Sequence, residues 1–189
     1  MFAYKKEYFF IIKNIKDINL KHIKRYNKFN IIYRNQNKVF DLCSLKNFRD
    51  KCKLKKIKFF VANNARIAVL LKADGVYLSS YNKNLSYLKL INLGFCLIGS
   101  AHNFKEIYQK KNQGCHKIIV SKLFKVESKP AGKVYDIIRF NNFRYFHKNV
   151  IPLGGIKSHN LNKLKMLNSE SFTMMSEIKK KPTISSRLF

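Results

Sequence analysis

The stretch Ile57–Ser79 reads IKFFVANNARIAVLLKADGVYLS, and its pattern decides the fold class. Two short apolar runs flank a segment in which apolar residues recur at helical spacing. Short, continuous apolar runs are typical of strands buried on both faces, and in parallel sheets such strands are joined by helices. The stretch therefore predicts a strand, a helix and a second strand parallel to the first.

The same alternation runs from one end of the chain to the other. We expect strands at Tyr8–Ile12, Asn30–Arg34, Ile57–Ala62, Gly75–Ser79, Phe95–Gly99, Lys117–Ser121, Val150–Leu153 and Phe172–Met175. We expect helices at Ile18–Tyr26, Leu42–Leu54, Ala65–Lys72, Leu85–Leu93, Phe104–Gln113, Lys133–Phe143 and Leu161–Leu167. Asn103 and Glu106 form a capping-box pattern, and Gly94 and Gly114 stand where helices commonly end with a positive φ.

Eight strands alternating with helices predict an α/β fold of the (β/α)8 barrel type, in a single domain over residues 1–181. After the eighth strand only Glu177–Lys181 precedes a polar tail at residues 182–189, so the last helix is short or missing. The alternative is an open doubly wound sheet, which would ordinarily carry a Gly-rich turn after its first strand. Lys13–Asp17 contains no glycine, and this favours the barrel.

The chain is strongly basic, with 39 Lys and Arg against 10 Asp and Glu and a formal charge of +29 over 189 residues. Of the basic residues 32 are Lys, spread along the whole chain, and Asn and Ile each occur 20 times. These residues have A/T-rich codons, so drift in base composition explains the excess. Nucleic-acid sites favour clustered Arg among aromatics. We therefore expect only non-specific nucleic-acid binding at low salt.

The sequence favours a cytoplasmic protein that is not embedded in a membrane. There is no run of 18 apolar residues, and the first residues do not form a secretory signal. Four cysteines, Cys43, Cys52, Cys96 and Cys115, show no spacing of a metal site. We expect them to be reduced, buried thiols.

A phosphate site is predicted after the seventh and eighth strands. Pro152-Leu-Gly-Gly-Ile156 closes the seventh strand, and the backbone N–H groups of Gly154 and Gly155 can approach an anion because no Cβ stands in the way. Ser176 follows the eighth strand and can add its hydroxyl group. In this fold phosphate is often held at that place.

Polar residues with weaker signals follow other strands. Ser100 ends the fifth strand, where its hydroxyl points to the barrel mouth, and His102 follows it on a loop with no carboxylate adjacent in the sequence. A catalytic Ser-His pair is therefore not expected. Lys129 follows the sixth strand and could neutralise a phosphate, although a single lysine is a weak signal among 32.

A set of short motifs follows the predicted strands in order: Phe60-Val-Ala-Asn-Asn64, Lys72-Ala-Asp-Gly-Val-Tyr-Leu78, Ile98-Gly-Ser-Ala-His102, Glu127-Ser-Lys129, Pro152-Leu-Gly-Gly-Ile156 and Met174-Met-Ser-Glu-Ile178. This ordered set resembles the thiamine phosphate synthase and TenI family of (β/α)8 barrels. The N-terminal third matches only through Ile31-Ile-Tyr-Arg34. The resemblance implies that a pyrimidine diphosphate loses diphosphate and that the nitrogen of a thiazole phosphate attacks the methylene carbocation that remains.

The resemblance also implies roles for individual residues. Arg34, Asn63, Ser100 and Lys129 match the family's contacts with the diphosphate and the pyrimidine, while Gly154, Gly155 and Ser176 match its thiazole-phosphate cradle. Mg²⁺ would be the cofactor of an active enzyme. Its carboxylates are replaced, however, because Asn64 and Asn82 stand at the expected acidic positions.

An amide oxygen carries no charge, so the two replacements should weaken Mg²⁺ binding. The loop after the sixth strand, Ser121-Lys-Leu-Phe-Lys-Val126, also lacks the family's Gly-Pro and Thr, and Lys122 or Lys125 could stand in for the cation. Asp74 precedes the fourth strand, at the end of the barrel that serves stability.

Three functions remain open. The first is a divergent enzyme of thiamine biosynthesis, either the synthase or a thiazole-phosphate tautomerase for which His102 is the nearest acid/base candidate. The second is a non-catalytic binder of a small phosphate ester on the same barrel. The third is a basic nucleic-acid-binding protein, which only the charge favours.

Overall fold

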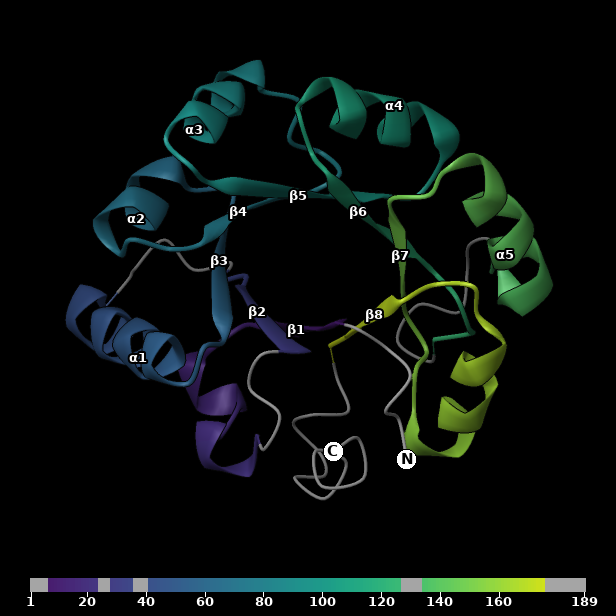
Figure 1. Ribbon diagram of the computed structural model, residues 1–189, viewed down its shortest axis with the longest axis horizontal. Helices are drawn as coiled ribbons and strands as arrows, with labels where there is room; N and C mark the ends of the chain where they lie inside the picture. Colours follow the sequence, from purple (N-terminus) through teal and green to yellow (C-terminus); the bar gives the residue numbers. More distant parts are fainter. Residues whose placement is uncertain (1–6, 24–27, 36–40, 127–133, 176–189) are drawn as a thin grey trace.

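The computed structural model is a closed barrel of eight parallel strands, and it describes residues 7–23, 28–35, 41–126 and 134–175. The strands are β1 (Glu7–Ile12), β2 (Phe29–Tyr33), β3 (Lys58–Ala62), β4 (Gly75–Leu78), β5 (Cys96–Ala101), β6 (Lys117–Ser121), β7 (Val150–Leu153) and β8 (Ser171–Met174). Each strand pairs with the next in the sequence, and β1 also pairs with β8 (Figure 1). The barrel prediction is confirmed, and the open sheet is excluded.

Helices cover the outside of the barrel (Figure 1). They are α1 (Leu42–Leu54), α2 (Ala65–Leu70), α3 (Lys89–Asn92), α4 (Phe104–Asn112) and α5 (Asp136–Phe146). The side chains of Asp41, Asn64 and Asn103 cap the first turns of α1, α2 and α4. Gly94 and Gly114 have φ values of +80° and +74°, as expected for residues that follow a helix.

Three expected helices are partly or wholly 3₁₀ segments in the described residues. These segments are η1 (Ile15–Asp17), η2 (Leu20–His22), η4 (Leu85–Leu88) and η5 (Ser158–Met166). The segments η2, η4 and η5 overlap the helices expected at Ile18–Tyr26, Leu85–Leu93 and Leu161–Leu167, while η1 directly precedes the first of these. Asn14 and Asn19 accept hydrogen bonds from backbone N–H groups two residues further on, which favours such turns over an α-helix.

The fifth α-helix begins and ends three residues later than expected, at Asp136–Phe146 instead of Lys133–Phe143. The expected last helix, Glu177–Lys181, and the tail at 182–189 lie outside the described residues.

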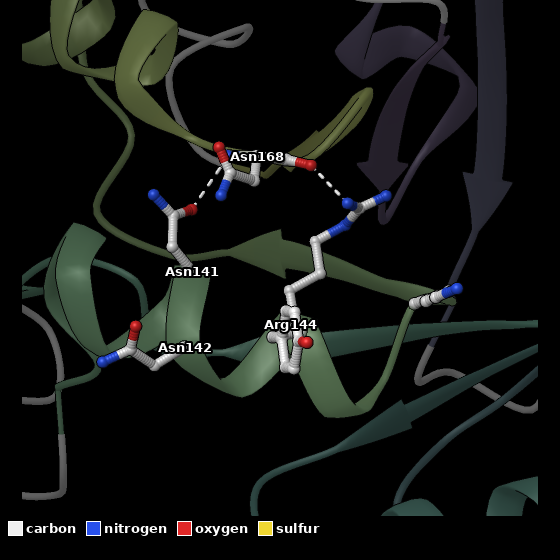
Figure 2. Close-up of a pocket in the computed structure, with 6 residues that line it drawn as sticks. Asn141, Asn142, Arg144 and Asn168 are labelled. Carbon is white, nitrogen blue, oxygen red and sulfur yellow. Dashed lines mark hydrogen bonds between the residues drawn. The ribbon is translucent and has the colours of Figure 1, made fainter.

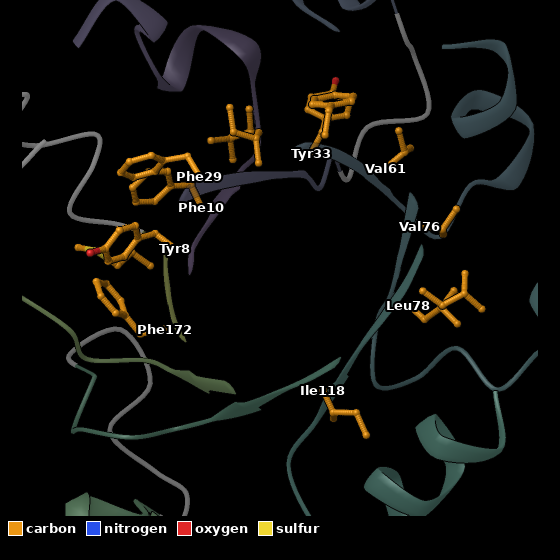
Figure 3. Close-up of a cluster of buried hydrophobic side chains, with 14 of the residues drawn as sticks. Tyr8, Phe10, Phe29, Tyr33, Val61, Val76, Leu78, Ile118 and Phe172 are labelled. Carbon is orange, nitrogen blue, oxygen red and sulfur yellow. The ribbon is translucent and has the colours of Figure 1, made fainter. Parts of the chain in front are cut away.

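Apolar side chains fill the barrel and also the layer around it. The interior cluster consists of Phe9, Ile11, Ile32, Phe60, Tyr77, Ile98, Ile119 and Ile151. On the outer face of the strands, the ring of Tyr8 packs against the rings of Phe29 and Phe172, each at a centroid distance of 5.1 Å (Figure 3). Burying such rings favours folding by about 25 cal/mol per Å². The two layers fix the strands, and therefore the place where each strand ends.

Candidate functional site

Most of the described candidate residues gather at one end of the barrel, which we call the mouth. Arg34 directly follows β2, Asn63 follows β3 and Ser79 follows β4, while Ser100 lies near the end of β5. All eight strands are parallel, so their carboxyl ends meet at this one end, where barrels of this type carry their active sites.

Tyr77 belongs to the motif Lys72–Leu78 but had no assigned role, and in the structure it is hydrogen-bonded to Ser100 and lies near Arg34. Its ring belongs to the interior cluster, and its side chain is 2% exposed. Burial raises the pKa of Tyr77, whereas a side-chain hydrogen bond with Ser100 and the positive charge of Arg34 act in the opposite direction. Tyr77 is therefore a neutral phenol beside a serine hydroxyl and a guanidinium group.

Asn63 is the centre of a hydrogen-bonded group of polar residues after β3 and β4, which we call the amide cluster: Asn63, Ser79, Tyr81, Asn82 and Tyr87. The Nδ2 of Asn63 donates to the hydroxyls of Ser79 (2.7 Å) and Tyr81 (3.0 Å). Its Oδ1 accepts from Ser79 N (2.9 Å) and Asn82 Nδ2 (3.1 Å). The Tyr87 hydroxyl donates to the Asn63 backbone carbonyl at 2.8 Å. Asn63 has a φ of +53°, a conformation that asparagine tolerates better than most residues.

The residues at the expected metal position do not fit Mg²⁺. Asn64 Oδ1 already accepts from Ile67 N at 2.9 Å as the cap of α2, and Asn82 Oδ1 accepts from Asn84 N at 3.0 Å. The described residues contain no group of three or more His, Cys, Asp or Glu that could hold a metal ion. Magnesium prefers charged carboxylate oxygens, and the oxygens here are neutral and already bound to N–H donors.

The turn after β7 presents two adjacent backbone N–H groups. Gly154 and Gly155 have φ values of +105° and +66°. A Cβ on Gly155 would lie 2.7 Å from the backbone oxygen of Lys125, so the turn requires glycine there. Within the described part of the chain, neither N–H donates a hydrogen bond.

The side chain of Asn160 stabilises this turn through hydrogen bonds. Its buried side chain donates from Nδ2 to the Gly155 carbonyl at 2.7 Å and accepts from Lys157 N at 2.9 Å. Both contacts are local in the sequence, since Asn160 stands in the first turn of η5, five residues after Gly155 and three after Lys157. Ser176, the expected third member of the cradle, lies outside the described residues.

The loop after β6 packs against the same turn. Leu123 N donates to Leu153 O at 2.9 Å, and Phe124 N donates to Gly154 O at 3.1 Å. Lys122 and Lys125, the suggested substitutes for a metal cation, lie in this loop, beside the cradle and not in the amide cluster. Lys129 lies outside the described residues.

His102 has a carboxylate partner, contrary to the expectation from the sequence. Glu106 Oε2 lies 3.0 Å from His102 Nδ1 and also accepts from His102 N at 2.7 Å. The helical turn of α4 brings position 106 back toward position 102, a closeness that adjacency in the sequence did not reveal. The side chain of His102 is 56% exposed, and among the described contacts none joins it to Ser100. The His102–Glu106 pair therefore stabilises the first turn of α4.

The opposite end of the barrel serves stability. Asp74 Oδ2 accepts from Phe59 N at 2.7 Å and pairs with Arg49 Nη2 at 3.1 Å, as its place before β4 led us to expect. A hollow of about 610 Å³ lies between α5 and the segment before β8 (Figure 2). There Arg144 donates to the Asn168 carbonyl, and Asn168 N donates to Asn141 Oδ1 at 2.8 Å. These bonds join α5 to the segment that leads into β8.

All four cysteines are free thiols, and two of them are buried as expected. Cys52 and Cys115 are buried and Cys96 is half-buried, but Cys43 is exposed on the first turn of α1. Burial raises the pKa of Cys52 and Cys115 to about 12. None of the described helices is long and apolar enough to span a membrane.

Comparison with solved structures supports the fold. The thiamine phosphate pyrophosphorylase of Pyrococcus furiosus superposes with a TM-score of 0.74 at 16% identity, covering 97% of this chain and 94% of that one. Phosphoribosyl anthranilate isomerase of Thermotoga maritima superposes with a TM-score of 0.61 at 11% identity, covering 96% and 99%. At such low identities the likeness concerns the barrel alone.

Comparison of sequences identifies the family. The chain is 28% identical to the thiamine-phosphate synthases of Prochlorococcus marinus over 131 residues and of Clostridioides difficile over 134 residues. The matches cover 67% and 68% of this chain but only 37% and 62% of those relatives. A family model described as thiamine monophosphate synthase matches residues 31–178. With this match over most of its length, the chain belongs to the thiamine monophosphate synthase family.

Proposed function

We propose that this protein binds a small phosphate ester, thiazole phosphate, at the turn after β7 as a divergent member of the thiamine biosynthesis pathway. The observation that carries the proposal is the pair of N–H groups of Gly154 and Gly155, which have no acceptor among the described residues. Two adjacent N–H groups in a turn with positive φ form a concave site for an anion. The Asn160 bond to Gly155 holds the turn in that shape before a ligand arrives.

The proposed reaction couples thiazole phosphate to the pyrimidine diphosphate. The bond between the methylene carbon and the diphosphate oxygen breaks, and its electron pair leaves with diphosphate. The lone pair of the thiazole nitrogen then forms the new carbon–nitrogen bond. Arg34 offsets charge on the leaving group, and the hydroxyls of Ser100 and Tyr77 are hydrogen-bond donors in the same part of the mouth.

The second candidate is a phosphate-ester binder without catalysis, and a specific observation favours it. The amide cluster and Asn64 supply no carboxylate where the family's metal ligands are expected. The loss of those charges affects the diphosphate half of the reaction and leaves the turn after β7 unchanged. Binding of thiazole phosphate without product formation would support this candidate.

Calorimetry with thiazole phosphate tests the shared part of both candidates. Gly155→Asp should weaken binding at least about tenfold, since charge-assisted hydrogen bonds contribute about 1.5–3 kcal/mol each. Gly94→Asp is the matched control, because Gly94 also has a positive φ but a Cβ added there would meet no atom within 4 Å. Equal affinity of wild type and Gly155→Asp would exclude the proposed cradle.

A coupling assay separates the two candidates. Purified protein is incubated with the pyrimidine diphosphate and thiazole phosphate, with Mg²⁺ or with a chelator, and thiamine phosphate is measured against a reaction without protein. Product formation identifies a synthase. Binding without product identifies the non-catalytic binder.

A further inference from the structure

Lys110 on α4 is a fully buried lysine, whereas the other lysines that the structure describes are mostly exposed. Its side chain is 0% exposed, and its Nζ donates to the Asn82 carbonyl (2.5 Å) and to Gln113 Oε1 (2.8 Å). No carboxylate of the described residues lies within ion-pair distance of Nζ. Burial of a lysine with neutral partners alone is costly, so the fold must gain something specific from it.

A glycine in β5 makes room for the Lys110 side chain. Gly99 lies on the outer surface of β5, beneath α4, and a Cβ at this position would lie 2.7 Å from Lys110 Cδ and 2.8 Å from Cγ. These distances are far below ordinary van der Waals contact. The lysine stem therefore crosses the strand over Gly99 and reaches the loop that follows β4.

The loop after β4 is held at two places by α4. Lys110 binds the Asn82 carbonyl, and Gln113 Nε2 donates to the Asn84 carbonyl at 2.9 Å. On the other side of the same loop, the Asn82 side chain donates to Asn63 Oδ1 at 3.1 Å. A continuous path of hydrogen bonds thus runs from the buried lysine to the centre of the amide cluster.

We propose that Lys110 is a positioning residue, which holds the loop after β4, and through Asn82 the amide cluster, where the residues do not fit a metal ion. A bound cation would fix such a loop from inside the mouth, by direct bonds to its side chains. Here the Lys110 side chain holds the loop from the side of α4, by a hydrogen bond to the Asn82 carbonyl. The inference rests on the proposed function only in that diphosphate is taken as the ligand near this loop.

Burial lowers the pKa of Lys110, while the nearby Cys115 and Glu106 act in the opposite direction. The positioning role itself depends on the geometry of the two hydrogen bonds and on the space over Gly99.

Hydrogen exchange on the protein without ligand tests this role directly. The amides of Ser79, Asn82 and Asn84 report on the loop, because each donates a hydrogen bond within it or to Asn63. Lys110→Met should raise their exchange rates at least about tenfold, as expected for the loss of about 1.4 kcal/mol of local protection. Ile107→Val is the matched control, since Ile107 is buried on the same helix and makes no contact with the loop among the hydrogen bonds described.

Ligand affinity separates positioning from general stability. Inorganic diphosphate should bind Lys110→Met at least about fivefold more weakly than Ile107→Val, whereas thiazole phosphate should bind both equally. Gln113→Met, which removes the second bond to the loop, should show the same pattern if Lys110→Met fails to fold. The inference would be overturned if the exchange rates of the loop amides were unchanged in both Lys110→Met and Gln113→Met. It would also be overturned if Ile107→Val raised these rates as much as Lys110→Met does. Failure of wild type to bind either ligand would overturn the proposed function instead, because the exchange measurement needs no ligand.

Discussion

The close approach of Gly99 and Lys110 predicts that substitutions at the two positions are energetically coupled. In Gly99→Ala, the new Cβ would stand 2.7 Å from Lys110 Cδ, 2.8 Å from Cγ and 3.0 Å from Cβ. The lysine stem must then move, and its hydrogen bonds to Asn82 and Gln113 move with it. Lys110→Ala removes Cγ and Cδ, so an alanine at position 99 should be tolerated far better in its presence.

The magnitude follows from the contacts. Overpacking in a well-packed layer costs about 1–3 kcal/mol, and we expect Gly99→Ala to lie in this range. Lys110→Ala leaves the buried oxygens of Asn82 and Gln113 without their donor, at about 1–3 kcal/mol for each unsatisfied group. The double variant should lose the contacts with Cγ and Cδ and keep only the 3.0 Å contact with Cβ, so it should be about 1–2 kcal/mol more stable than the sum of the single effects predicts.

Urea unfolding of wild type, both single variants and the double variant measures this coupling. A change of 1 kcal/mol corresponds to a shift of about 2–4 °C in Tm for a chain of this size, so thermal unfolding gives an independent reading. Gly75→Ala is the matched control, because its Cβ would meet the Cys96 carbonyl oxygen at 2.0 Å, which Lys110→Ala does not relieve. Additivity of Gly99→Ala and Lys110→Ala to within about 0.5 kcal/mol would refute the steric argument.

Four further predictions concern other parts of the chain. Asn64→Ala should destabilise the protein by about 1 kcal/mol in urea unfolding through loss of the α2 cap, while Asn64→Asp keeps the cap. Asp74→Ala should cost about 1–3 kcal/mol, because Phe59 N loses its acceptor and Arg49 keeps the Lys72 carbonyl but loses its carboxylate partner. The affinity for thiazole phosphate should remain unchanged in calorimetry. Burial, and then the charge of Lys111, lower the pKa of His147 in the folded state. The unfolded chain therefore takes up this proton first, and stability should fall as pH drops through about 6.5, with a shallower fall in His147→Phe. Filter binding should detect nucleic acid at about 20 mM salt and lose it near about 150 mM, whereas tight, sequence-selective binding at the higher salt would contradict compositional drift.

The strands could be predicted well because their signal is local. Each strand of the barrel is buried on both faces, so Val, Ile and Phe occur in short unbroken runs such as Lys117–Ser121, and each predicted strand overlaps the observed one. The outer layer was less predictable. Apolar spacing at Ile18–Tyr26 and Leu161–Leu167 suits an α-helix, but asparagine side chains bind the neighbouring backbone and 3₁₀ turns form in the described parts.

The candidate site was predictable where it depends on backbone, and less so where it depends on side chains meeting across strands. The glycines at 154 and 155 mark a turn that few other residues could form, so the turn is visible in the sequence. Tyr77 could have been found from the alternation of the fourth strand, since it shares an inward face with Ser79. Lys110 could not have been found in this way, because nothing local in the sequence distinguishes it from the many other lysines of the chain.

The departures at the expected metal positions fall on one side of the mouth, and the strand order separates them from the turn after β7. In the ring of eight strands, β3 and β4 stand opposite β7 and β8. A metal site depends on carboxylate side chains, so single substitutions such as those giving Asn64 and Asn82 remove its charge. The turn at Gly154 and Gly155 offers backbone N–H groups, which no substitution elsewhere removes as long as Asn160 and the loop after β6 hold its shape. The proposed phosphate-ester binding and the proposed diphosphate chemistry therefore depend on different parts of the barrel, and we expect the binding to persist in variants that abolish the chemistry.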